Sequence, residues 1–174
     1  MERKKLMHKT PYGYCGMPCA LCNRNRTEGP SKCTGCSYGG YYGDSCKIKK
    51  CCEAKRHPHC ALCEEYPCPR IQHLEDFGNL DTSGCWADIA DDIQRKGFED
   101  WHQALKRKSD MLTAALETYN DGRMKRFLCE LFIQQDLDTL ERIMEAAKQL
   151  EGSKKDISER FKRIVKGHIE QGSA

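Results

Sequence analysis

Cysteine is the residue type in this sequence whose number and spacing most clearly predict chemistry. Three pairs follow the C-x2-C pattern, at Cys19–Cys22, Cys33–Cys36 and Cys60–Cys63. Two intervening residues allow a tight turn to direct both sulfurs at one ion while backbone N–H groups point at the thiolates. Gly35 in "CTGC" suits such a turn because glycine tolerates a positive φ. Three such pairs in one short stretch favour metal binding over buried free thiols.

Iron–sulfur chemistry uses similar spacings and is the alternative to zinc. The stretch "YCGMPCALC" has the C-x3-C-x2-C spacing of the cluster motif in radical S-adenosylmethionine enzymes. Those enzymes need a partial barrel of alternating strands and helices, for which this chain lacks both the length and the pattern. "CALCEEYPCP" ends in Cys-Pro, as bacterial ferredoxin motifs do, but its C-x2-C-x4-C spacing differs from theirs. We therefore expect zinc and keep an ordinary iron–sulfur cluster as the second candidate.

Disulfide bonds are less favoured because the sequence predicts a cytoplasmic protein. Its start, "MERKKLMHKTPYGY", is charged and contains no apolar run of signal-peptide length. No stretch approaches the roughly 18 apolar residues of a membrane span, so no membrane association is expected. Cytoplasmic thiols are kept reduced, and a dense cysteine pattern there indicates metal more often than disulfides.

Composition divides the chain near residue 70. Eleven of the 13 cysteines precede that point, among many Gly, Pro and Tyr residues and with no apolar face longer than a turn. Such a segment cannot bury enough apolar surface to offset its conformational entropy, so bound metal has to supply the missing stabilisation. We predict a Cys-rich metal-binding region at 1–70, built of zinc knuckles or short hairpins, and a helical region at 71–174, the two packed as one unit.

Periodic apolar residues predict a series of helices after residue 68. The expected segments are 69–78, 81–97, 98–119, 123–132, 137–150 and a last helix through Ile157, Phe161, Ile164 and Ile169. Candidate caps are Asp81, Thr82 or Ser83 and Asp136 at helix starts, and Gly97 at a helix end. The predicted fold is therefore mainly α, with a small irregular Cys-rich part packed on a helical bundle.

Charge follows the same division. Residues 1–70 carry 13 Lys and Arg against 6 Asp and Glu, a formal +7, and residues 71–174 carry 16 against 20, a formal −4, which sum to +3. A basic surplus can indicate nucleic-acid binding. However, each zinc ion with four thiolates carries −2, so two such sites would reduce +7 to +3. Any nucleic-acid binding is therefore expected to be weak and non-specific.

Seven motifs occur in order over about 14–150: "YCGMPCALC", "CTGC", "CKIKKC", "CALCEEYPCPRI", "SGCW", "GFEDW" and "NDGRMKRFLCELF". This order resembles the cysteine-rich domain of unknown function 3795 family of bacteria and archaea. The resemblance implies an intracellular protein that binds metal, commonly taken as zinc, with no established activity. Ten cysteines fall on the family's recurrent positions and are the candidate metal ligands: Cys15, Cys19, Cys22, Cys33, Cys36, Cys46, Cys51, Cys60, Cys63 and Cys68.

Ligand counting favours two zinc ions and leaves three possible. Two tetrahedral sites need eight ligands, and the ten candidates form two groups of five in sequence order. We favour one site from each group, with Cys19, Cys22, Cys33 and Cys36 as the first quartet, although cross-braced pairing stays open. A third site would need all eleven cysteines of this region and His57 or His59, which we interpret as surface residues. The remaining histidines are interpreted as solvated or packing residues: His8, His73, His102 and His168.

The two cysteines outside the Cys-rich region are expected to pack in the helical core. Cys85 and Cys129 lie beside large apolar residues, and a buried free cysteine behaves as a small hydrophobe. A reactive thiol near Arg123, Lys125 and Arg126 is the alternative. No Ser/His/Asp set, phosphate-binding loop, dinucleotide fingerprint or HExxH motif occurs, so the sequence gives no support for an enzyme.

Two classes of function fit these observations. The first is a structural-zinc module that binds an unknown protein partner, because sites made only of cysteine leave no open coordination position. The tyrosines of the loop "GGYYG" (39–43) offer contact area for such a partner at low entropic cost. The alternative is an iron–sulfur or thiol-based redox protein, a sensor or an enzyme accessory.

Overall fold

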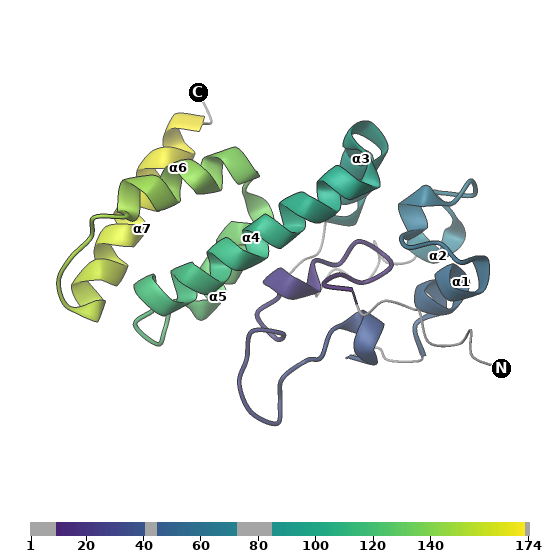
Figure 1. Ribbon diagram of the computed structural model, residues 1–174, viewed down its shortest axis with the longest axis horizontal. Helices are drawn as coiled ribbons and strands as arrows, with labels where there is room; N and C mark the ends of the chain where they lie inside the picture. The colour runs from purple at the N-terminus through teal and green to yellow at the C-terminus, as the bar shows by residue number, and fades with distance from the viewer. Residues whose placement is uncertain (1–9, 41–44, 73–84, 173–174) are drawn as a thin grey trace. The chain divides into compact units, whose positions relative to one another are not determined.

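The computed structural model describes residues 10–40, 45–72 and 85–172 (Figure 1). The chain divides into two compact units, residues 1–105 and 106–174. The boundary falls inside one long helix, α4 (Phe98–Tyr119). The compositional boundary near residue 70 thus lies within the first unit, which combines the Cys-rich segment with α3 (Cys85–Lys96) and the start of α4.

The Cys-rich segment is built from short turns and two small helices. Its elements are the 3-10 turns η1 (Cys19–Leu21), η2 (Cys36–Tyr38) and η4 (Cys60–Leu62) and the helices α1 (Lys47–Lys55) and α2 (Pro69–Gln72). Helix α1 contacts α2, and η4 contacts α3. The described residues contain no β-strand, so the short hairpins suggested from the sequence are replaced by 3-10 turns. In these turns the backbone bonds locally, as from Cys22 N to Cys19 O, and has no neighbouring strand to pair with.

Helix α1 was not predicted from the sequence. Its N-cap is Cys46, whose sulfur accepts from the Lys49 amide at 3.4 Å, and it ends at Arg56, which has a left-handed φ of 60°. Ile48 and Cys52, four residues apart, are its buried apolar side chains. Periodicity rules miss the helix because its apolar face contains only these two residues among lysines.

Aromatic side chains form part of the core of the first unit. The Tyr12 ring lies 5.0 Å from Trp101 and 5.9 Å from Phe98, both in edge-to-face orientation. His102 stacks on Phe98 at 5.9 Å, which confirms its interpretation as a packing residue. Edge-to-face ring pairs of this kind add about 0.5–1.5 kcal/mol each to the stabilisation from burial. The start of α4 is thereby tied to the segment that precedes Cys15.

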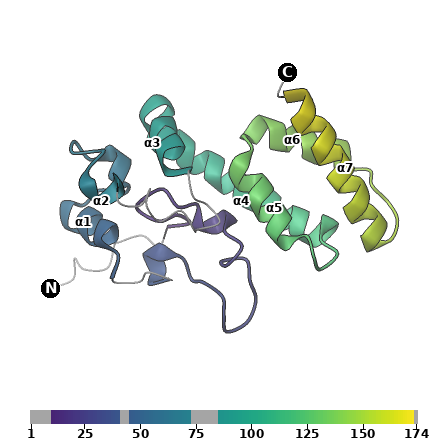
Figure 2. The same ribbon diagram turned by 180° about the vertical axis from the view of Figure 1, so that it is seen from behind.

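The second unit contains the rest of α4 and the helices α5 (Lys125–Gln134), α6 (Leu137–Ala147) and α7 (Lys154–Gly172). Helices α6 and α7 lie side by side in both views (Figures 1 and 2). Phe132 and Phe161 are fully buried, and the Tyr119 ring stacks on Phe161 at 4.2 Å. Seven core residues of this unit show no exposed surface: Leu112, Ala115, Leu128, Phe132, Leu140, Ile143 and Phe161.

Polar side chains cap the ends of these helices. Asp136 Oδ1 accepts from the Thr139 amide at 2.7 Å, which confirms the predicted cap of α6. At the C-terminus of α5, Lys108 donates to the Gln135 carbonyl at 2.5 Å. At the C-terminus of α4, Lys154 donates to the Glu117 carbonyl. Both lysines therefore satisfy carbonyl groups near helix C-termini, which otherwise have no partner within the helix.

The periodic pattern predicted the long helices well. Helix α4 has the predicted bounds, and α3, α5, α6 and α7 fall within or close to their predicted segments. Gly97 has a φ of +93° and its amide bonds to the Ile93 carbonyl, as expected for the end of α3. The candidate caps at 81–83 lie outside the described residues. No described helix is both long and apolar enough to cross a bilayer.

Candidate metal centre

Five cysteines line one small cavity between α1, η4 and α2. They are Cys51, Cys52, Cys60, Cys63 and Cys68, and His57 lies beside them. The cavity has a volume of about 30 Å³, which is room for a single ion but not for a larger organic molecule. The five cysteines all lie within residues 51–68, and the contact between α1 and α2 folds this stretch around the cavity.

Two cations lie against the sulfurs of this cavity. Lys55 Nζ lies 3.6 Å from Cys63 Sγ and Arg70 Nη1 lies 3.8 Å from Cys51 Sγ, both in donor geometry. Lys55 also pairs with Glu65 at 2.7 Å. A cation beside a sulfur offsets the negative charge that a metal-bound thiolate carries. The cavity therefore combines soft donors with partial compensation of their negative charge.

The deeper thiols are neutral in the absence of a metal ion. Burial raises the pKa of Cys52 to about 12, and burial together with Cys52 and Cys15 also raises the pKa of Cys60. Metal binding at such thiols has to release protons, so metal affinity increases with pH. The donor set suits a metal that binds thiolate strongly enough to displace those protons, as zinc and iron–sulfur clusters do.

A second group of cysteines surrounds η1 and η2. Cys19 and Cys36 share a hydrogen bond that, with burial, raises the pKa of Cys36. Cys15 packs with Cys36 against a small buried cluster of Met17 and Cys19. The loop after the first C-x2-C segment also meets the start of the second, since Cys33 N donates to Arg24 O at 3.0 Å. The structure thus places the two turns of the favoured quartet next to each other.

Glycine permits the close approach of the chain at Cys33. A Cβ at Gly40 would lie 3.0 Å from Cys33 Sγ and 2.6 Å from the Gly35 carbonyl oxygen. Any side chain at position 40 would therefore collide with the backbone of the turn and with the thiol. This glycine is required for the loop to fold back over Cys33.

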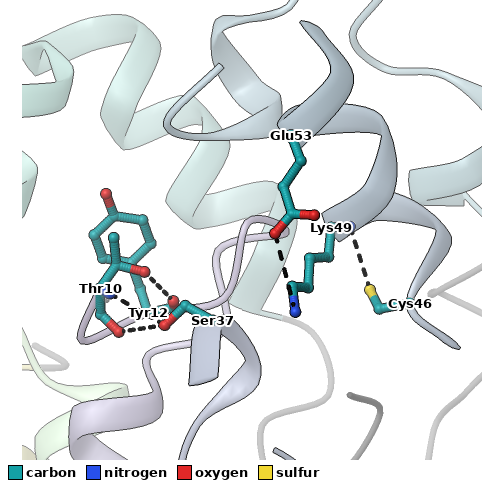
Figure 3. A network of polar contacts seen from close by, with 6 residues as sticks. All are labelled: Thr10, Tyr12, Ser37, Cys46, Lys49 and Glu53. Atoms are coloured by element: carbon teal, nitrogen blue, oxygen red, sulfur yellow. Dashed lines mark hydrogen bonds and ion pairs between the residues drawn. The ribbon is translucent and has the colours of Figure 1, made fainter. Parts of the chain in front are cut away.

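A polar network holds the ends of this group in place (Figure 3). Ser37, next to Cys36, accepts from Thr10 N at 3.1 Å and donates to Thr10 O at 2.8 Å. In the same view Lys49 lies beside Cys46 and pairs with Glu53 at 3.9 Å. The hydroxyl of Ser37 thereby ties the η2 turn to the segment leading to Cys15.

The structure brings four of the second group of five predicted ligands to one cavity. Of the second group of five, Cys51, Cys60, Cys63 and Cys68 line the cavity, whereas Cys46 does not and caps α1 instead. Cys52, which is not among the ten, also lines the cavity. Its i, i+4 spacing from Ile48 becomes a signal only once α1 is known to be a helix. In the described residues no three Cys, His, Asp or Glu side chains are already arranged as a metal coordination shell.

The interpretation of His59 as a surface residue is wrong. Its side chain is 1% exposed, and burial lowers its pKa to about 4, so the ring is neutral at physiological pH. Sequence reasoning failed because "KRHPHC" is polar, whereas the fold turns this one ring inward onto Tyr12 and Trp101. His57, by contrast, is partly exposed at the cavity.

The remaining sequence predictions concern single residues. Cys129 is 1% exposed, which agrees with a packing role. The side chain of Cys85 and residues 41–44 of the "GGYYG" loop lie outside what the structure describes. None of the twelve described cysteines forms a disulfide.

Comparisons of the chain with family models, with curated protein sequences and with solved structures gave no match.

Proposed function

We propose that this chain is a metal-binding protein whose Cys-rich segment is stabilised by structural zinc. The observation that carries the proposal is the convergence of five cysteines on one cavity, two of them contacted by cations. Cys51, Cys60, Cys63 and Cys68 would supply a complete tetrahedral set. Bound zinc would crosslink α1, η4 and the start of α2, a segment whose buried apolar clusters are small.

Charge balance supports zinc at this cavity. A zinc ion with four thiolates carries −2, and the adjacent Lys55 and Arg70 offset part of this charge, with Lys55 also paired to Glu65. A buried charge is costly unless it is paired, so these two cations reduce the cost of placing the charged centre in the fold. The same balance explains why a basic surplus in this segment need not indicate nucleic-acid binding.

The proposed role is contact with a protein partner. Saturated cysteine sites leave no position for a reacting water, which favours structure over catalysis. Tyr38 and Leu62, at the turns η2 and η4, are 46% and 40% exposed and offer apolar contact surface. The family resemblance and the free thiols support a reducing, cytoplasmic location for this role.

Metal analysis of variants tests the proposal. Untagged protein purified anaerobically under reducing conditions should contain zinc. Cys60→Ser and Cys63→Ser should each lower it by about one equivalent, because a tetrahedral site loses one of its four bonds. Cys129→Ser is the matched control and should keep the full zinc content. Unchanged zinc in both cavity variants would contradict the assignment of this cavity.

The same preparation separates zinc from the redox alternative. Thiolates are the ligands of iron–sulfur clusters as well as of zinc, so the same cysteines keep a cluster as a second candidate. Iron and inorganic sulfide in the anaerobic protein, with visible absorption lost on exposure to air, would support the cluster and replace the zinc proposal.

A further inference from the structure

The sequence Cys-Ala-Leu-Cys occurs twice in the Cys-rich segment, at 19–22 and at 60–63. Both copies form the same 3-10 turn. The amide of the second cysteine donates to the carbonyl of the first in each, at 3.1 Å from Cys22 to Cys19 and at 3.0 Å from Cys63 to Cys60. Two turns of one sequence allow their surroundings to be compared directly.

The two turns are anchored by different residues. Leu21 of the first turn is 2% exposed, so its side chain fixes the turn in the core. Leu62, at the same position of the second turn, is 40% exposed and cannot do this. The second turn must therefore be held by something other than its leucine.

His59 supplies that anchor. It is the N-cap of η4, and its Nδ1 accepts from the Ala61 amide at 3.0 Å. Pro18, at the same position before η1, makes no side-chain cap bond. The His59 ring lies 5.3 Å from Trp101 and 6.1 Å from Tyr12, so packing fixes the direction of Nδ1.

A neutral histidine supplies both the packed ring and the hydrogen-bond acceptor that this position uses. Since Nδ1 accepts a hydrogen bond, the ring proton is on Nε2, which is buried and has no hydrogen-bond partner among the described residues. An unpaired buried donor is unfavourable. A phenylalanine would avoid that cost but would leave the Ala61 amide unpaired, and it could not hold the turn.

We propose that His59 is a positioning residue for the metal centre: it fixes the Cys60–Cys63 turn through the Ala61 amide and does not itself bind the metal. This inference rests on the proposed function, because the turn matters through its two thiols. It also assigns His59 a role distinct from both surface exposure and metal ligation. Groups that orient metal ligands in this way typically change metal affinity by about 10- to 100-fold when lost.

The test compares His59→Phe, which keeps a ring but loses the acceptor, with Leu62→Ala as the control in the same turn. Zinc titration against a competing chelator should show about 10- to 100-fold weaker binding at the site that needs Cys60 and Cys63 in H59F. Zinc bound through the other cysteines should be unaffected, and L62A should bind as the wild type does. Unchanged affinity in H59F, or equal weakening at every site, would overturn the proposal.

Hydrogen exchange of the Ala61 amide provides a readout that is separate from metal affinity. With zinc in excess this amide should exchange faster in H59F than in the wild type, and His59→Asn should restore protection because Asn is a strong N-cap acceptor. Exchange as fast in H59N as in H59F would overturn the capping role. If the wild type binds no metal, the proposed function fails, whereas the Ala61 measurement still tests the cap.

Discussion

The Cys-rich segment and the second unit bury their side chains by different means. In the second unit, large apolar residues from four helices are fully buried, among them Phe132, Leu128 and Phe161. In the Cys-rich segment, one buried cluster contains Tyr14, Ile48, Cys52 and Ile71 and another contains only Met17 and Cys19. Burial of apolar surface can stabilise the second unit by itself, whereas the Cys-rich segment is the one expected to need bound metal.

The largest expected difference between the two regions is their response to metal removal. Chelation under reducing conditions should remove most amide protection from residues 10–40 and 45–72, because the binding free energy of structural zinc is also folding free energy, on the order of 10 kcal/mol. The helices of the second unit should keep their protection. Hydrogen exchange followed by mass spectrometry measures both in one sample. Equal protection of the Cys-rich segment before and after chelation would show that bound metal does not stabilise it.

A cavity in the helical core should destabilise the second unit and leave metal binding by the Cys-rich segment unchanged. Phe132→Ala should lower the free energy of unfolding of the second unit by about 3–5 kcal/mol, because Phe132 has no exposed surface. Its zinc content should match the wild type. Denaturation followed by circular dichroism, together with metal analysis, measures the two quantities. Exposed Glu145→Ala is the control and should change neither; loss of zinc in F132A would show that the two regions are not independent.

Cys129 allows a test of whether every cysteine in this chain belongs to metal chemistry. Cys129→Ser places a hydroxyl in an apolar site and should destabilise the second unit by about 1–3 kcal/mol. Cys129→Ala, which adds no polar group, should cost less. Neither variant should change the zinc content, since Cys129 is buried in a helical core. A zinc deficit in both would mean that the second unit contributes a ligand.

The smallest expected effect concerns the N-cap of α6. The Thr139 amide holds the pKa of Asp136 below its ordinary value, so the stabilisation is complete above the unfolded pKa of the carboxyl group and is lost as pH falls through the folded pKa. Asp136→Ala should cost about 1 kcal/mol at neutral pH, and Asp136→Asn should cost less. Unfolding of the second unit at neutral and at acidic pH measures this. The difference between D136A and the wild type should shrink in acid; a constant difference would contradict the carboxylate cap.

Sequence reasoning performed best where burial is periodic. Apolar spacing, Asp136 and Gly97 were sufficient for the long helices because each signal acts within a turn or two of the helix. In the Cys-rich segment the sequence identified the donor type and the C-x2-C turns. It did not separate Cys46 from Cys52, since both are cysteines in one short stretch and only the direction of α1 distinguishes them.

His59 shows why the burial of individual side chains in the Cys-rich segment could not be derived from the sequence. Its neighbours in sequence are Pro58 and Cys60, and nothing local indicates that its ring packs on Trp101, more than forty residues away. Burial of a polar residue depends on such distant contacts, whereas composition reports only the local average. Likewise, the identical turns at 19–22 and 60–63 predict one local conformation but not which of the two leucines is buried.

The two lysines that cap helix C-termini in the second unit are positions where covalent modification would affect the fold. Lys108 and Lys154 each place an ammonium group on carbonyls at the end of a neighbouring helix. Acetylation would remove the charge that complements the negative end of the helix dipole and would add bulk where the nitrogen now lies. Acylation at these two positions would therefore loosen helix ends inside the bundle, whereas the same modification of the exposed Lys162 would change surface charge alone.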